Sequence, residues 1–405
     1  MHNVWTTYGE AARTAFGFFW KSGWAFVLGY TISAAIQAFV PKKRLSAQMG
    51  DAGAKSISLA TVFGTISSSC SFAALAAARA LVHKGAHFVA AIAFMFASTN
   101  LVIELGILIV IFLGWEFLAA EIVGGLILIA ISSGLFKLTS PKAWLEAARN
   151  KVEDEADTDE QDFDWKTRIR TLEGWSRVGD NFVGEWAMVW QEILIGFTLA
   201  GFIAVFVPDT FWKAIFLSDL AANDPSNFWI VLENAAIAPF VAAATFIGSM
   251  GNIPLATVLS SGGVLFGGIM GFIYSDLMVP PLVKVNAKYY GWRVALYIAT
   301  IMYVSITCTA LLLHYAFFFM GLTPESAREV ADVAQFKIDY TFYMNLAAVF
   351  VGGAMLWLRG WRRRHVDGAG ATQDKGGGVG VQDVVTWAFI TVLIGGGIAF
   401  ALTSA

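Results

Sequence analysis

Two short polar segments interrupt long apolar stretches, one in each half of the chain. Residues 66–72 read Ile-Ser-Ser-Ser-Cys-Ser-Phe, and residues 248–252 read Gly-Ser-Met-Gly-Asn and are followed by Pro254. Lipid cannot satisfy backbone N–H and C=O groups, so irregular backbone at membrane depth is tolerated only where protein or a water-filled cavity surrounds it. A pair of such breaks in the two halves of a chain is the best sequence indication of a transporter binding site.

The composition is that of a membrane protein. Of the 405 residues, 57% are hydrophobic and 14% are charged, whereas about 25% of the residues of soluble domains are charged. The net charge of -3 gives no reason to expect nucleic acid as a partner. Cys70 and Cys308 both lie in apolar stretches and imply no disulfide framework. We expect no cleavable signal peptide, because the N-terminus is polar and the first apolar run is long enough to stay in the membrane.

Apolar runs of about 20 residues predict full membrane spans. These runs lie near 16–40, 86–113, 116–137, 185–207, 263–283, 292–320, 340–358 and 383–403. Two further stretches, 46–83 and 228–262, each consist of a helical arm, a polar break and a second arm. We predict that both are re-entrant hairpins. With this assignment most loops rich in Lys and Arg fall on one side, as the positive-inside rule requires, whereas two full crossings would scatter them. The predicted fold is all-α and polytopic, with about ten hydrophobic segments.

Matching landmarks in the same order predict two inverted repeats, which is a recurring transporter design. The pairs are Ala38-Phe-Val-Pro41 with Val205-Phe-Val-Pro208, Lys84-Gly85 with Gly262-Gly263, and Gly114-Trp115 with Gly291-Trp292. The predicted divisions are a first repeat at 1–138, a charged cytoplasmic loop at 139–182, a second repeat at 183–320, and C-terminal helices with a Gly-rich linker at 321–405. Chance similarity among apolar segments is the alternative, and the shared order of the landmarks weighs against it.

The two polar tips are the candidate substrate-binding sites. The first tip presents hydroxyls and a thiol, and its residues are Ser67, Ser68, Ser69, Cys70 and Ser71. A thiolate suits a soft metal or metalloid, although small residues also allow close helix packing. At the second tip, Gly251 permits unusual backbone conformations, Asn252 is polar, and Pro254 suits the first turn of a helix. A helix N-terminus there would face an anion or a polarised ligand, and a plain structural turn is the alternative.

Among the polar residues inside the apolar spans, we single out Asn100, Glu104 and Asp276 as site candidates beyond the tips. An ionisable residue within a membrane is costly and is by default a functional candidate. We predict that Asn100 contacts substrate and that Glu104 and Asp276 carry protons or a coupling cation. Pairing with Lys21 or Lys284 is the alternative for the two carboxylates.

The other carboxylates are weaker site candidates, and the sequence lacks common catalytic motifs. Glu121, Glu192 and Glu233 rank lower as candidates, because each can sit nearer a membrane interface. No Walker-type phosphate loop, His-Glu-x-x-His pair or Gly-x-Ser-x-Gly motif occurs. We therefore predict no enzymatic activity, no cofactor and no dedicated metal site.

The polar motifs resemble a known family. Ser67-Ser-Ser-Cys-Ser-Phe-Ala-Ala74, Phe96-Ala-Ser-Thr-Asn-Leu-Val-Ile-Glu-Leu-Gly106, Gly251-Asn-Ile-Pro-Leu-Ala256 and Phe272-Ile-Tyr-Ser-Asp276 are similar to the predicted permease family that includes the ArsP-like organoarsenical efflux permeases and the YraQ-like permeases. The resemblance covers about residues 15–320. It implies a multi-pass permease of the inner membrane that exports a small solute. The arsenical exporters tend to have more cysteine at the first motif, whereas serines surround Cys70 here.

The sequence therefore predicts a secondary transporter whose substrate binds between the two tips. The substrate is a small molecule or ion, with metalloid and soft-metal compounds as one class, and the lipid bilayer is the surrounding partner. Two alternatives remain open: a membrane thiol or redox module that pairs Cys70 with Cys308, and a non-transporting scaffold that recruits partners through the acidic run at 153–164. The oligomeric state is also open, a homo-oligomer included.

Overall fold

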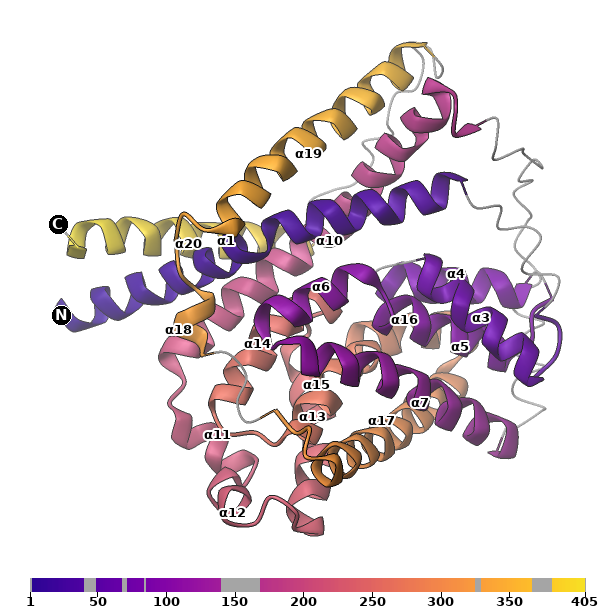
Figure 1. Ribbon diagram of the computed structural model, residues 1–405, viewed down its shortest axis with the longest axis horizontal. Coiled ribbons are helices and arrows are strands. Elements are labelled where there is room, and N and C mark those ends of the chain that lie inside the picture. The colour runs from indigo at the N-terminus through magenta and orange to yellow at the C-terminus, as the bar shows by residue number, and fades with distance from the viewer. Residues whose placement is uncertain are drawn as a thin grey trace. The chain divides into compact units, whose positions relative to one another are not determined.

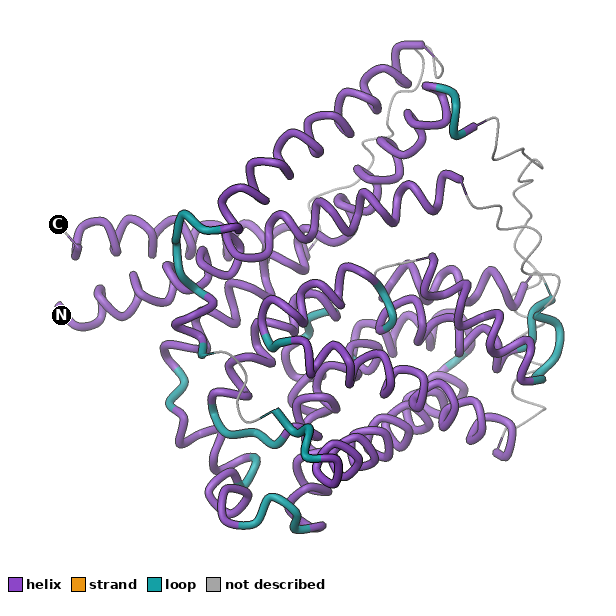
Figure 2. Tube along the Cα trace, in the orientation of Figure 1, coloured by secondary structure: helices purple, strands orange, loops and turns teal. Residues whose placement is uncertain are grey.

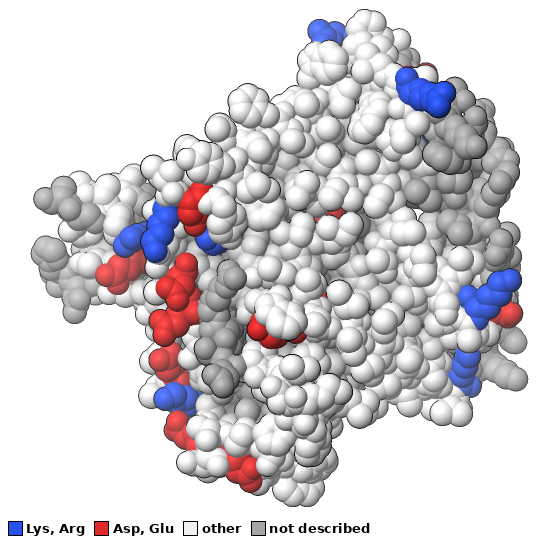
Figure 3. All heavy atoms as spheres, viewed as in Figure 1, with Lys and Arg blue, Asp and Glu red and all other residues white. Residues whose placement is uncertain are grey.

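The chain folds as helices throughout its described part. The computed structural model describes residues 2–39, 49–67, 71–83, 85–139, 168–324, 329–365 and 381–404. Every regular element in these ranges is a helix (Figures 1 and 2), which confirms the predicted all-α class. Within the same ranges, six helices are long and apolar enough to cross a membrane, or eight if each of two bent helix pairs is one span. Figure 3 shows broad surface areas without Lys, Arg, Asp or Glu on the face in view, as lipid contact requires.

The helices group into two compact units. The first comprises Met1–Pro41, Phe163–Pro208 and Glu329–Ala405, and the second comprises Lys42–Asp162 and Asp209–Arg328. Each unit takes helices from both predicted repeats. The division of the chain at residues 138, 182 and 320 therefore stays a prediction, and most of the predicted charged loop and of the Gly-rich linker lies outside the described residues.

The first unit is built on two long helices, α1 (His2–Phe39) and α10 (Leu172–Phe206), which pack along each other (Figure 1). Helix α19 (Tyr340–His365) packs on both, α20 (Val381–Ser404) packs mainly on α1, and the short α18 (Val330–Val333) precedes α19. Helix α1 contains residues 16–39 of the span predicted at 16–40. It is not one of the six apolar helices, because Ser, Thr and Gln interrupt its apolar stretch.

Side-chain hydrogen bonds and ion pairs tie the helices of the first unit together. The Asn345 side chain of α19 forms two hydrogen bonds with the backbone of α1. Its Nδ2 donates to the Trp20 carbonyl at 2.7 Å, and its Oδ1 accepts from the Trp24 N–H at 2.9 Å. In a regular helix the Trp24 N–H would donate to the Trp20 carbonyl. Lys21 pairs with Asp339 at 3.3 Å. Interhelical polar contacts of this kind substitute for the hydrophobic drive that lipid removes.

The second unit repeats one order of elements. The first series is α3 (Ala54–Ser67), α4 (Ser71–His83), α5 (Phe88–Asn100), α6 (Ile103–Phe112) and α7 (Trp115–Thr139). The second is α13 (Phe228–Thr245), α14 (Ser249–Ser261), α15 (Phe266–Ile273) with the 3-10 turn η1 (Tyr274–Met278), α16 (Pro280–Tyr290) and α17 (Trp292–Met320). The short α11 (Asp209–Ile215) and α12 (Ser218–Asn223) precede the second series. Each series is a broken helix pair, a bent pair and a long helix, and the two bends measure 42° and 41°.

The landmarks that predicted a repeat also share backbone geometry. Gly85 and Gly263 both have positive φ, at 93° and 83°, and Gly114 and Gly291 have 118° and 86°. Other residues avoid these conformations, which explains glycine at all four places. Each glycine of the second pair directly precedes an exposed Trp that begins a long helix, α7 or α17. These matches support a structural repeat, and its inverted relation stays a prediction.

The core of the second unit consists of helices that are buried all round. In α5, α14 and α15 almost every side chain is inaccessible to solvent, as expected for helices without a polar face. Close approach needs small residues: a Cβ at Gly64 of α3 would lie only 2.8 Å from the Ala97 Cβ of α5. Polar side chains on these central helices are therefore enclosed by protein.

Candidate functional site

The first predicted tip contacts a carboxylate from the second series of helices. Helix α3 ends at Ser67 and α4 begins at Ser71, and both side chains are buried. The Ser71 Oγ donates a hydrogen bond to Asp276 Oδ2 at 2.9 Å. Ser68, Ser69 and Cys70 lie outside the described residues. The fold thus joins two of the predicted site residues that are 205 positions apart in the chain.

Asp276 lies in η1 and is fully buried. Its Oδ1 has no hydrogen-bond partner among the described residues, and no ion pair there reaches it. Lys21, one of the two lysines considered as its partner, pairs with Asp339 instead. A buried carboxyl that pairs with no cation among the described residues is costly to maintain, so Asp276 is the strongest functional candidate in the unit.

Glu121 is a second buried carboxyl beside Asp276. It lies on α7 with 1% exposure, and it pairs with no cation in the described ranges. It interacts electrostatically with Asp276, and the Tyr274 hydroxyl donates to the adjacent backbone carbonyl of Ala120 at 3.0 Å. The sequence placed Glu121 among the lower-ranked candidates, because its place six residues into α7 suggested a position near the interface, whereas the structure buries its side chain. No group of three or more His, Cys, Asp or Glu that could hold a metal occurs in the described part of the chain.

Asn100 and Glu104 flank the bend between α5 and α6. Asn100 ends α5, where its Nδ2 donates to the Phe96 carbonyl at 3.2 Å, and its Oδ1 is buried without a partner among the residues described. Glu104 is buried in the first turn of α6, where the helix dipole favours a negative charge. The bonds of Asn100 lie within α5, and its contact with substrate stays a prediction.

The second tip differs from the prediction in two ways. Phe246, with φ of 56°, supplies the left-handed conformation at the end of α13, whereas Gly251 is a regular residue of α14. The unusual backbone conformation expected at Gly251 is therefore wrong. Helix α13 therefore ends at a left-handed C-cap that lies two positions before the expected break at 248–252. Helix α14 begins at Ser249, so Pro254 lies beyond its first turn. There, its missing N–H deprives the Met250 carbonyl of its usual helical donor.

Asn252 stabilises the turn between α13 and α14. It is fully buried, its Oδ1 accepts from the Thr245 hydroxyl at 3.3 Å, and its Nδ2 lies 3.5 Å from the Ile247 carbonyl. The Thr245 hydroxyl in turn accepts from the Ile247 N–H at 3.3 Å. These contacts fit the structural-turn interpretation, and substrate binding by Gly251, Asn252 and Pro254 stays a prediction.

These features define an all-helical multi-pass membrane protein whose central helices enclose carboxyl groups. The sequence model of a family described as "Predicted permease" matches residues 8–315, and the chain therefore belongs to this predicted permease family. "Putative permease Rv2963" of Mycobacterium tuberculosis (strain ATCC 25618 / H37Rv) is 36% identical over 321 residues, which cover 76% of this chain and 77% of that protein. No solved structure matches the chain. The resemblance expected from the motifs is confirmed, and the protein is a membrane permease for a small-molecule substrate.

Proposed function

We propose that this permease is a secondary transporter of the cell inner membrane whose substrate site lies between the two helix tips of the second unit. The hydrogen bond from Ser71 to Asp276 is the observation that carries the proposal, because it links a broken hairpin to a broken helix at a fully buried carboxyl. Irregular backbone and buried charge at one place in a membrane are tolerated where they serve a substrate pathway.

Asp276 and Glu121 are the proposed coupling pair. Both side chains are buried, and neither forms an ion pair in the described ranges. Two close carboxylates repel each other strongly in a low-dielectric interior. A bound proton or cation would offset this repulsion and keep the two side chains close together. Binding of that ion at Asp276 would weaken its bond to Ser71 and free the tip for substrate. Glu104, in the first turn of α6, is the further predicted coupling residue.

The proposed substrate class is a metalloid or soft-metal compound, and the proposed direction is export. Both follow from the family resemblance and from Cys70, whose thiolate would be a soft ligand in the first tip. The matching element orders of α3–α7 and α13–α17 support movement of one inverted repeat against the other.

The experiment is flux in proteoliposomes under an imposed proton gradient. A growth screen of a deletion strain against arsenicals, antimonials, mercurials and transition metals first selects the substrate. We expect Asp276→Asn to abolish gradient-driven flux and Cys70→Ser to weaken substrate binding. Glu233→Gln is the matched control: this half-buried carboxylate on α13 is bonded to the neighbouring Asn234 and lies about 18 Å along the helix from Thr245. Equal flux in wild type and in the Asp276 and Cys70 variants would refute the assigned roles.

A further inference from the structure

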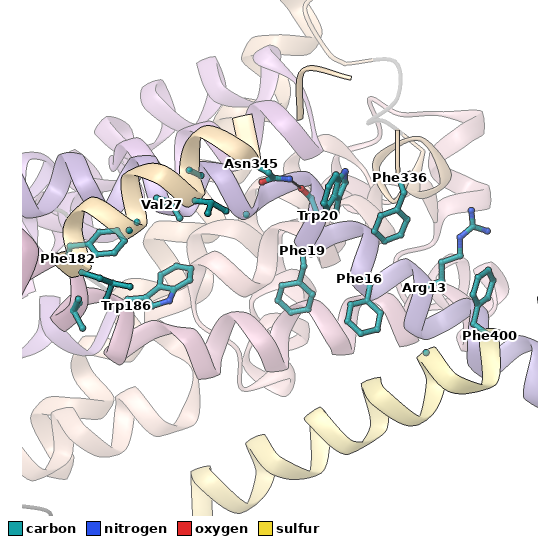
Figure 4. Close-up of a pocket in the computed structure, with 18 residues that line it drawn as sticks. Arg13, Phe16, Phe19, Trp20, Val27, Phe182, Trp186, Phe336, Asn345 and Phe400 are labelled. Atoms are coloured by element: carbon teal, nitrogen blue, oxygen red, sulfur yellow. Dashed lines mark hydrogen bonds between the residues drawn. The ribbon is translucent and has the colours of Figure 1, made fainter. Parts of the chain in front are cut away.

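The first unit contains an apolar groove that the transport site does not use. The groove has a volume of about 980 Å³ and is lined by residues of α1, α10, α19 and α20, together with Phe336. In Figure 4, Arg13 and Phe400 stand together at one end, and Val27, Phe182 and Trp186 lie at the other. Its size falls within the range of ligand pockets, about 300–1,000 Å³.

The groove offers little to a polar ligand along its length. Apart from the indole N–H groups of its tryptophans, the uncharged polar side chain in the groove lining is that of Asn345. Both the oxygen and the nitrogen of this amide are hydrogen bonded to the backbone of α1. Gly352 and Gly353 form part of the wall, and a Cβ at either would meet no atom of the described chain within 4 Å. The absent side chains leave an open apolar channel on a helix that also exposes Val349 and Leu356.

The length of the groove matches one lipid leaflet. Arg13 and Val27 both line it, and fourteen positions of α-helix span about 21 Å. A bilayer with its headgroups is about 40–45 Å thick, so one leaflet measures about 20–22 Å. A lipid with its head at Arg13 would therefore end its acyl chain near Val27.

A polar pocket adjoins the groove at its Arg13 end. It has a volume of about 510 Å³ and shares Arg13 and Phe336 with the groove. Its charged lining residues are Arg13, Lys337 and Glu10, all exposed, and none has an ion pair among the described residues. Two cations and one anion complement a headgroup that carries one phosphate and one ammonium group.

We propose that this groove and pocket bind one phosphatidylethanolamine molecule from the bilayer. Its phosphate lies at Arg13 and Lys337, its ammonium group donates to Glu10, and one acyl chain fills the groove toward Val27. A quaternary ammonium cannot donate hydrogen bonds, so the site prefers phosphatidylethanolamine to phosphatidylcholine. An anionic headgroup without an amine leaves Glu10 unpaired, so phosphatidylglycerol binds more weakly.

The test is lipid retention by the full-length protein, measured by native mass spectrometry after titration with phosphatidylethanolamine, phosphatidylcholine or phosphatidylglycerol in micelles. Gly353→Leu places a Cβ in open space and its larger side chain in the groove. We expect the affinity of this variant for phosphatidylethanolamine to fall roughly tenfold or more, as the loss of two buried methylene contacts implies. Gly184→Leu is the control, because Gly184 is an exposed helical glycine with open space around it in the described structure and does not line the groove.

The headgroup variants separate the two charges. We expect Arg13→Gln with Lys337→Gln to weaken binding of all three lipids, and Glu10→Gln to abolish the preference for phosphatidylethanolamine over both phosphatidylcholine and phosphatidylglycerol. Equal phosphatidylethanolamine binding by wild type and Gly353→Leu overturns the proposal, as does tighter binding of phosphatidylglycerol by wild type. Conversion of a wild-type dimer to a monomer by Gly353→Leu, read by light scattering, would assign the groove to a second copy of the chain and also overturns it.

Discussion

The hydrogen bond between Ser71 and Asp276 predicts a measurable coupling between a helix tip and a broken helix. Ser71→Ala removes the donor and leaves a fully buried carboxyl oxygen without its partner, which costs about 1–3 kcal/mol. Asp276→Leu removes the acceptor at similar volume. The interaction energy of the pair comes from the double-mutant cycle, because each single change also alters packing.

The expected coupling energy is about 1 kcal/mol. Interhelical hydrogen bonds in a membrane protein average about 0.6 kcal/mol and reach about 1.7 kcal/mol. The Ser71 bond is 2.9 Å long, which is longer than the roughly 2.5–2.7 Å of a strongly charge-assisted O–H···O bond and argues against the upper limit. We therefore expect a value between these two figures.

The assay is reversible unfolding in bicelles by steric trapping. The control is Ser132→Ala, because the Ser132 hydroxyl is equally buried but donates within its own helix, to the Ile129 carbonyl. We expect Ser132→Ala and Asp276→Leu to be additive. A coupling of Ser71 to Asp276 below about 0.3 kcal/mol, which is within the error of additivity, would refute the contact.

Three further predictions concern packing and local stability. Gly64→Leu should destabilise the second unit by about 1–3 kcal/mol in the same unfolding assay, because its Cβ would lie 2.8 Å from that of Ala97; a neutral result would contradict the close approach of α3 and α5. Asn345→Leu should cost only about 1 kcal/mol despite the loss of two bonds, because the α1 backbone can restore its own hydrogen bond; a much larger loss would contradict this repair. The Ser56 hydroxyl and Gly53 amide hold the pKa of Asp51 below its usual value. Its stabilisation of the start of α3 should therefore be complete above about pH 3.9 and lost as the pH falls through the lower folded pKa. The measurement is hydrogen-exchange protection of residues 54–57. A loss of protection already between pH 7 and pH 5 would contradict this role of Asp51. Unchanged protection in Asp51→Asn at pH 7 would contradict it as well.

The sequence located most helices well because hydropathy and helix-breaking residues act locally. The predicted spans at 116–137 and 292–320 became α7 and α17, and each begins directly after a positive-φ glycine. The spans predicted at 86–113 and 263–283 lie in bent helix pairs, a break that the hydropathy pattern did not predict. The second bend coincides with Pro280, which cannot donate the helical hydrogen bond that a straight span requires.

The candidate site was only partly predictable. Asp276 was chosen because a charge within apolar sequence is rare. The same reasoning did not predict the burial of Glu121, which depends on helices far away in the chain. At the second tip, a left-handed residue was expected at a glycine, but Phe246 has that conformation at the end of α13. Residue type sets only a preference there, and tertiary packing overrides it.

The sequence by itself determined that the chain is helical, that it resides in a membrane, and where its polar interruptions lie, because lipid imposes these properties segment by segment. Only the tertiary structure decided that Ser71 meets Asp276, that Glu121 lies beside it, and that α1, α10, α19 and α20 enclose a groove. Each of these depends on which helices pack together, and helix packing is a property of contacts between segments distant in the chain.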